Sequence, residues 1–145
     1  MIQRLVGSEM CIRDRMHTGD AGRMDEEGFV FIQDRIKDMI VSGGENIYST
    51  EVEAALFAHP DVVDAAVIGV PDEKYGEVVK ACIVKKEGSN VTEADLISFC
   101  KDRIASYKKP QSVDFIDEVP RNASGKVLKK VLREPYWKDQ ERQVS

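Results

Sequence analysis

Apolar residues along the chain fall into short runs separated by turn-forming residues. The run at residues 77–85 alternates, so that Val79, Ala81 and Ile83 share one face, which is typical of a half-buried β-strand. The run at residues 62–70 is nearly continuous, as in a buried strand. Shorter runs that also predict strands lie at residues 28–32, 39–41 and 113–116.

Three further segments predict helices. Thr50 and Glu53 match a capping box, so a helix is expected from there to about Ala58, stopped by Pro60. Its expected inward residues are Val52, Ala55 and Leu56.

A second capping box, formed by Thr92 and Asp95, opens another helix. Its expected buried stripe consists of Ala94, Ile97, Cys100 and Ile104. Residues 126–133 are expected to form a third, short helical segment. Because strands and helices interleave, the predicted fold class is α+β, with a small mixed sheet and about three helices packed on it.

Composition narrows the class of protein. The 145 residues are 42% apolar and 32% charged, with a net charge of −5, which predicts a globular domain and disfavours a nucleic-acid binder. No apolar run is long enough to span a membrane. The three cysteines and two histidines have no zinc-binding spacing, so we expect no metal site and free thiols in a reducing, cytoplasmic compartment.

Residues 1–15 differ from the rest of the chain. They mix charged, glycine and apolar residues without a sustained period, and residues 7–15 resemble translated adapter DNA. We expect a non-native or disordered leader, and an ordinary frayed terminus is the alternative.

Three loops collect glycine and charged residues: 18–20, 34–46 and 120–126. Each can be read as a solvated turn. Alternatively, the carboxylate of Asp20 could accept hydrogen bonds from a ribose diol, and the adjacent Gly43 and Gly44 would let a ligand approach the backbone closely.

The loop at 120–126 looks like a phosphate-binding P-loop but does not match one, because Pro120 stands where the first glycine should be and Val127 follows the lysine. Residues 121–133 contain five basic residues and no acid. This patch could bind nucleic acid, although it has no aromatic residue for stacking. Lys126 would suit a phosphate or carboxylate oxygen instead.

Taken together and in order, these loops resemble the C-terminal domain of the adenylate-forming superfamily, in its fatty-acyl and aryl-CoA synthetase branch. The resemblance covers about residues 16–136. The blocks that carry it are Thr18-Gly19-Asp20, Asp34 to Tyr48, Glu51-Val52-Glu53, Gly69-Val70-Pro71-Asp72 with Gly76-Glu77, Tyr107-Lys108-Lys109-Pro110, and Pro120 to Lys126.

The resemblance implies a role for each of several residues. Asp20 and Arg35 would bind ATP and AMP, Lys37 would be the hinge, and Lys126 would be the catalytic lysine of adenylation. The residues implied to bind CoA are Gly43, Gly44, Glu45 and Lys108. The substrates implied for the full-length enzyme are ATP with Mg²⁺ and CoA, none held tightly by this chain alone.

The implied organisation is the end of a linker at 16–36, a C-terminal AMP-binding-enzyme (lid) domain at 37–136 and a tail at 137–145. A separate N-terminal adenylation domain would be the partner, so we expect this chain alone to be inactive. The alternative is a stand-alone interaction module of the same fold without catalysis. Three positions depart from the usual family pattern: Arg15 stands two residues before His17 where an aromatic residue is usual, Asp34 replaces a frequent Gly, and Thr50 a frequent Pro.

Overall fold

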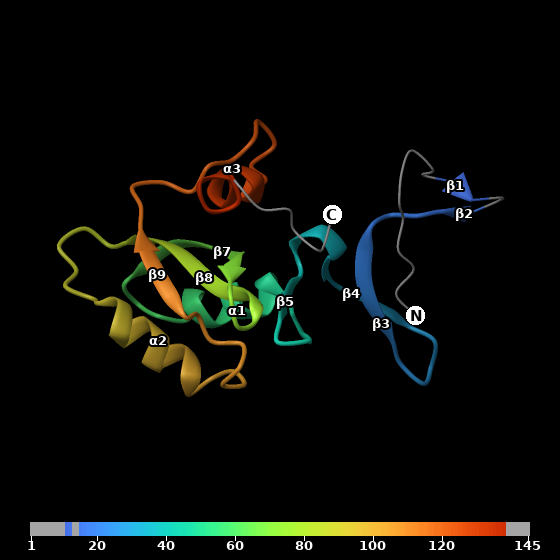
Figure 1. The fold of residues 1–145 in the computed structure, drawn as a ribbon, viewed down its shortest axis with the longest axis horizontal. Helices are drawn as coiled ribbons and strands as arrows, with labels where there is room; N and C mark the ends of the chain where they lie inside the picture. Colours follow the sequence, from blue (N-terminus) through green and yellow to red (C-terminus); the bar gives the residue numbers. More distant parts are fainter. Residues whose placement is uncertain (1–10, 13–14, 139–145) are drawn as a thin grey trace.

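A computed structural model describes residues 11–12 and 15–138 of the chain. It consists of a hairpin and a sheet domain joined by one short 3₁₀ helix, η1 (Ile36–Asp38) (Figure 1). The hairpin, residues 20–35, pairs β3 (Asp20–Met24) with β4 (Val30–Arg35) in antiparallel fashion. A further two-residue pair, β1 (Cys11–Ile12) with β2 (Arg15–Met16), precedes it. The predicted leader at 1–15 lies largely outside the described residues.

The sheet domain, residues 40–137, is built on five strands. β7 (Val62–Asp72) and β8 (Gly76–Lys85) form its long antiparallel centre. On its other edge, the first residue of β8 pairs with β5 (Ile40–Ser42). β5 in turn pairs with β6 (Glu45–Ile47). Farther along, β8 pairs in parallel with β9 (Ser112–Phe115). The mixed sheet expected from the sequence is therefore confirmed.

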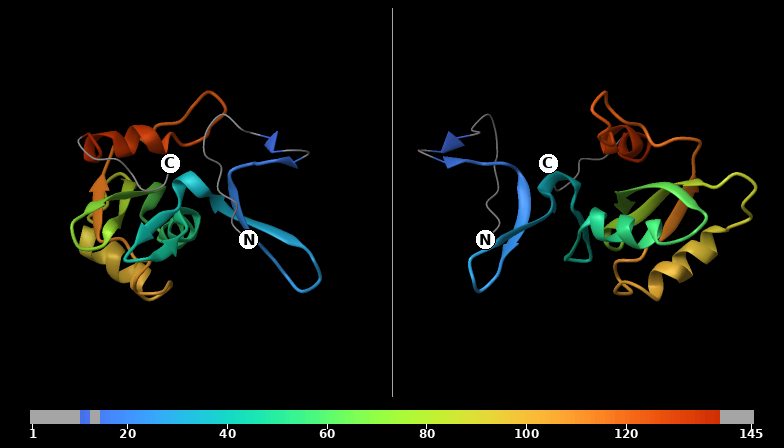
Figure 2. Two further views of the ribbon diagram at one scale, coloured as in Figure 1. Left: turned by 45° about the vertical axis from the view of Figure 1, so that its right-hand side comes forward. Right: turned by 180° about the vertical axis from the view of Figure 1, so that it is seen from behind.

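Helices cover both faces of this sheet. α1 (Ser49–Phe57) and α2 (Glu93–Lys101) pack on one face, and the short α3 (Lys129–Arg133), followed by the 3₁₀ turn η2 (Glu134–Tyr136), lies on the other (Figures 1 and 2). The three predicted helices are present, although the last begins three residues later than the 126–133 segment suggested. No helix within the described residues is both long and apolar enough to cross a membrane.

The main core lies between the sheet and the first two helices. Alternate residues of β8 enter it, as predicted from the period of two, together with buried side chains from β5, β6, β7, α1 and α2. Its fully buried members include Ile40, Ile47, Val52, Leu56, Val67, Ala81, Ile83, Leu96 and Cys100. A smaller cluster under α3 contains Ile68, Val70 and Cys82, with Leu132 packed against it.

One detail of the prediction for α2 is wrong. The stripe predicted for α2 included Ala94, which is exposed, whereas Leu96 is fully buried in its place. The Thr92–Asp95 capping box is present with both of its hydrogen bonds.

The capping box predicted at Thr50 and Glu53 does not form, because tertiary partners take both side chains. The Thr50 hydroxyl donates to the Gln33 carbonyl oxygen at 2.8 Å. The Glu53 carboxylate instead accepts from the backbone N–H of Val67 at 2.9 Å. The first turn of α1 is capped from a distance by the Asp34 carboxylate.

Candidate functional site

The end of the hairpin nearest the sheet domain brings two predicted nucleotide-binding residues together. Asp20 begins β3 and Arg35 ends β4, and the two are direct cross-strand partners. Gly19, with φ of +76°, turns the chain just before Asp20, and its carbonyl oxygen accepts from the N–H of Ile36. This register places a carboxylate and a guanidinium side by side at the junction with η1.

The loop carrying Lys126 is organised by one side chain, that of Asn122. Its Oδ1 accepts from the backbone N–H groups of Ser124 and Lys126, at 3.0 and 2.8 Å. Gly125 adopts a φ of +82°, and its carbonyl oxygen accepts from the Arg121 guanidinium. The loop therefore fixes the Lys126 backbone while its side chain stays exposed to solvent.

A groove of about 210 Å³ lies between η1 and the segment from Lys126 into α3. Lys37 and Lys126, the predicted hinge and catalytic lysine, both line it. The other lining residues are Asp38, Val127, Leu128, Lys129, Lys130 and Arg133. The lining of this groove therefore includes five cationic side chains and one carboxylate.

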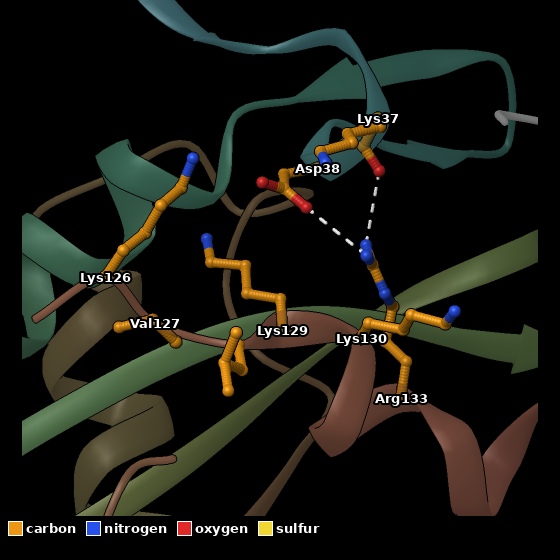
Figure 3. Close-up of a pocket in the computed structure, with 8 residues that line it drawn as sticks. Lys37, Asp38, Lys126, Val127, Lys129, Lys130 and Arg133 are labelled. Atoms are coloured by element: carbon orange, nitrogen blue, oxygen red, sulfur yellow. Dashed lines mark hydrogen bonds and ion pairs between the residues drawn. The ribbon is translucent and has the colours of Figure 1, made fainter. Parts of the chain in front are cut away.

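Two of those cations are held by specific partners. The Lys129 ammonium lies 2.8 Å from Glu53, and the Arg133 guanidinium bonds Asp38 and the Lys37 carbonyl oxygen at 3.3 and 3.2 Å. Figure 3 shows the Arg133 guanidinium reaching Lys37 and Asp38 of η1, whereas the Lys129 ammonium points away from η1 and Lys130 points to the side. The Lys126 side chain is exposed at one end of the groove, and neither it nor Lys130 has an ion-pair partner among the described residues.

The basic patch at 121–133, for which nucleic-acid binding was an alternative that the composition disfavoured, is largely neutralised. Arg121 forms an ion pair with Asp64 at 2.8 Å, and Lys129 and Arg133 are paired as described above. A surface that attracts a phosphate backbone needs uncompensated charge, so these ion pairs weigh against nucleic-acid binding.

The residues implied to bind CoA lie at the other end of the sheet domain. Gly43 and Gly44 form the two-residue turn between β5 and β6, with φ of +58° and +86°, as a tight hairpin of this kind requires. Gly44 faces open space, whereas a side chain at Gly43 would meet the Tyr75 ring. Glu45, the first residue of β6, is exposed.

Lys108 lies in the loop after α2, at that same end of the domain (Figures 1 and 2). Its ammonium contacts both carboxylate oxygens of Glu51, at 2.9 and 2.7 Å. Hydrogen bonding to Glu51 raises the pKa of Lys108, although partial burial opposes the shift. Lys108 is thus a charged group that a phosphate would have to share with Glu51.

The sequence reasoning missed the groove residues Lys129 and Arg133. Their spacing of four residues places them on one face of α3, which is a visible signal. Their partners, Glu53 and Asp38, lie far away along the chain, so the pairing itself had no local signature.

Comparison with known proteins identifies the family. The family model described as AMP-binding enzyme C-terminal domain matches residues 51–126. A 3-[(3aS,4S,7aS)-7a-methyl-1,5-dioxo-octahydro-1H-inden-4-yl]propanoyl:CoA ligase of Rhodococcus jostii (strain RHA1) is 55% identical over 82% of this chain and 23% of its own length. The long-chain-fatty-acid–CoA ligase FadD13 of Mycobacterium tuberculosis (strain CDC 1551 / Oshkosh) is 49% identical, over 82% of this chain and 24% of its own.

Among solved structures, ATP-bound MatB from Rhodopseudomonas palustris superimposes with a TM-score of 0.77 at 44% identity. The match covers 83% of this chain and 24% of that one. The chain thus spans about a quarter of the length of the relatives it matches. This chain belongs to the AMP-binding enzyme C-terminal domain family.

Proposed function

We propose that this chain is the mobile C-terminal domain of an ATP-dependent acyl-CoA synthetase, an acid–thiol ligase that forms AMP. In the whole ligase, a carboxylate attacks the α-phosphate of magnesium-bound ATP, which gives acyl-AMP and releases pyrophosphate. The CoA thiol then displaces AMP to give the thioester. An N-terminal adenylation domain would be the partner of this chain and would hold the acyl pocket. These substrates, and the free thiols of Cys82 and Cys100, favour a cytoplasmic location.

The observation that carries this proposal is the exposed Lys126 on a loop with a fixed backbone. Negative charge collects on the α-phosphate oxygens as the carboxylate attacks. An ammonium held where that charge develops lowers the barrier more than it stabilises bound ATP. Asp20 and Arg35 would bind the ribose and phosphates from the end of the hairpin, because they lie side by side there.

The two ends of the sheet domain suit the two half-reactions. The loop carrying Lys126 lies at one end, and the β5–β6 turn with the loop of Lys108 lies at the other (Figures 1 and 2). A rotation about Lys37, in the single connection between hairpin and sheet domain, would present one end and then the other to the same acyl group. Gly43, Gly44, Glu45 and Lys108 would then contact CoA.

The first test is Lys126→Ala in the full-length ligase. We expect single-turnover adenylation to fall by about 10²–10³-fold, the usual cost of losing one group that stabilises developing charge. Thioester formation from supplied acyl-adenylate should persist. Lys101→Ala, an exposed lysine on α2, is the control. Equal losses in both steps would contradict the assigned role.

The second test is Gly44→Leu, which places a side chain where CoA would pass. We expect thioester formation to fall while adenylation persists. Gly44 has a φ of +86°, so the variant also strains the backbone. Gly88→Leu, at a φ of +76° with open space around it, carries the same strain in the loop between β8 and α2. If it impairs thioester formation equally, Gly44 has no specific role in CoA binding.

A further inference from the structure

Three hydrogen bonds cross from the hairpin to the sheet domain beside η1. The Ser49 hydroxyl donates to Asp34 Oδ2 at 2.6 Å, and the backbone N–H of Thr50 approaches the same oxygen at 3.4 Å. The Thr50 hydroxyl donates to the Gln33 carbonyl oxygen at 2.8 Å. All three join the end of β4 to the first turn of α1, on opposite sides of Lys37 in sequence.

The contact between Ser49 and Asp34 is buried, which makes it costly to break. Asp34 is 8% exposed and Ser49 is fully buried. A carboxylate removed from water needs hydrogen-bond donors, and Asp34 Oδ2 finds its donors only on α1 within the described residues. Separating β4 from α1 would leave that oxygen without them until water reached it.

The same contacts continue to the groove of Lys126. Ser49 Oγ donates its hydrogen to Asp34 and accepts a hydrogen bond from the Lys129 ammonium. Lys129 lies three residues after Lys126 and also pairs with Glu53 of α1. A continuous path of polar contacts therefore connects the hairpin, the start of α1 and the base of the Lys126 loop.

We propose that Asp34 and Ser49 are positioning residues that latch the sheet domain in the orientation used for adenylation. This inference rests on the proposed function, which supplies the pivot at Lys37. Asp34 precedes the pivot and Ser49 follows it, so rotation must break their contact. The latched state holds the Lys126 loop on the side where Asp20 and Arg35 end the hairpin.

The first experiment measures orientation without catalysis. Spin labels at Glu27→Cys in the hairpin turn and Ser98→Cys on α2, both exposed, report the distance between hairpin and sheet domain by pulsed electron resonance. The background is Cys11→Ser. Cys82 and Cys100 are buried, and burial raises the pKa of each thiol to about 11, so they should resist labelling.

Ser49→Ala should reduce the latched population at least about tenfold relative to other orientations, because a buried hydrogen bond to a charged group typically contributes that much to an equilibrium. The distance distribution should gain a second population. Ser112→Ala is the matched control, because Ser112 Oγ also accepts from a lysine, Lys80, at 3.1 Å, but lies wholly within the sheet domain. If Ser49→Ala gives the same distance distribution as the parent and as Ser112→Ala, the latch is refuted.

Thr50→Pro is the second variant, because it leaves the buried Ser49 in place. Proline is tolerated in the first turn of a helix, and this change removes both bonds that Thr50 makes to the hairpin. It should shift the distances in the same direction as Ser49→Ala and by less. An unchanged distribution in a folded Thr50→Pro protein would contradict the latch.

The second experiment uses the full-length ligase. Ser49→Ala should slow single-turnover adenylation several-fold and leave thioester formation from acyl-adenylate unchanged or faster. Ser112→Ala should alter neither rate. A parallel loss in both steps would overturn the positioning role. If the distances respond but Lys126→Ala spares adenylation, the latch stands and the proposed role of Lys126 fails.

Discussion

The hairpin and the sheet domain use apolar residues in opposite ways. In the sheet domain, large side chains such as Ile40, Leu56 and Ile83 are fully buried. In the hairpin, Phe29 is 61% exposed and Ile32 is 65% exposed, and Met24, Val30 and Phe31 are also exposed. The sheet domain can supply its own stability, whereas an isolated two-stranded hairpin is marginal in water.

The exposed side chains of the hairpin indicate that it packs against something else. Contiguous exposed apolar residues commonly mark an interface. The stretch of this chain that matches the relatives covers only 23–24% of their length. We therefore expect the hairpin to dock on the N-terminal part of the proposed ligase, and the sheet domain to rotate only after the contact between Asp34 and Ser49 breaks.

The largest expected effect concerns activity. The purified chain should form no CoA thioester from ATP, CoA and any fatty acid, because most of the barrier reduction comes from positioning the substrates on surfaces outside it. The measurement is thioester production by the pure chain, with the full-length ligase as positive control. Detectable turnover would show that the hairpin and sheet domain form a complete catalyst.

The next effect compares one isoleucine from each region. Ile83→Ala should lower the free energy of unfolding of the sheet domain by about 2–5 kcal/mol, because it leaves a cavity in the core. Ile32→Ala should change it by less than about 0.5 kcal/mol, as for other exposed positions. Urea titration of the chain measures both. Similar losses would mean that the hairpin belongs to the same folding unit.

How far the sequence predicted this structure depended on how local each interaction was. The capping box at Thr92 formed because both of its members lie within one helical turn. The one at Thr50 failed because Asp34, sixteen residues earlier, caps that helix instead. The prediction that Val79, Ala81 and Ile83 share the core face of β8 was correct, because alternation along a strand is also a local property.

In the candidate site too, local features were predictable from the sequence and tertiary contacts were not. Lys126 was proposed as catalytic because it sits in a recognisable motif, and adjacent glycines indicated the bend that Gly43 and Gly44 form. The latch between Asp34 and Ser49 and the groove contacts of Arg133 depend on tertiary packing. Apart from the spacing within α3, the sequence contained no local signal for them.

The smallest expected effect is a pH dependence confined to the sheet domain. On the face covered by η2, Asp114 accepts a hydrogen bond from Tyr136 and pairs with Lys80 at 2.8 Å. Burial tends to raise the pKa of Asp114, but its hydrogen bonds with Lys80 and Tyr136 outweigh this and lower it below 3.8. The stability that this lowered pKa contributes is present above that value and is lost as pH falls through the folded pKa.

Asp114→Asn should therefore lower the stability of the sheet domain slightly at neutral pH, and the difference from the parent should vanish once the pH falls below the folded pKa of Asp114. The effect is small because the Asp114 side chain is 40% exposed and solvent screens the pair. Amide exchange in the hairpin should not change, because these contacts lie within the sheet domain. If hairpin amides respond as strongly as those of β9, the contribution of Asp114 is not confined to the sheet domain, and the two regions share their stability.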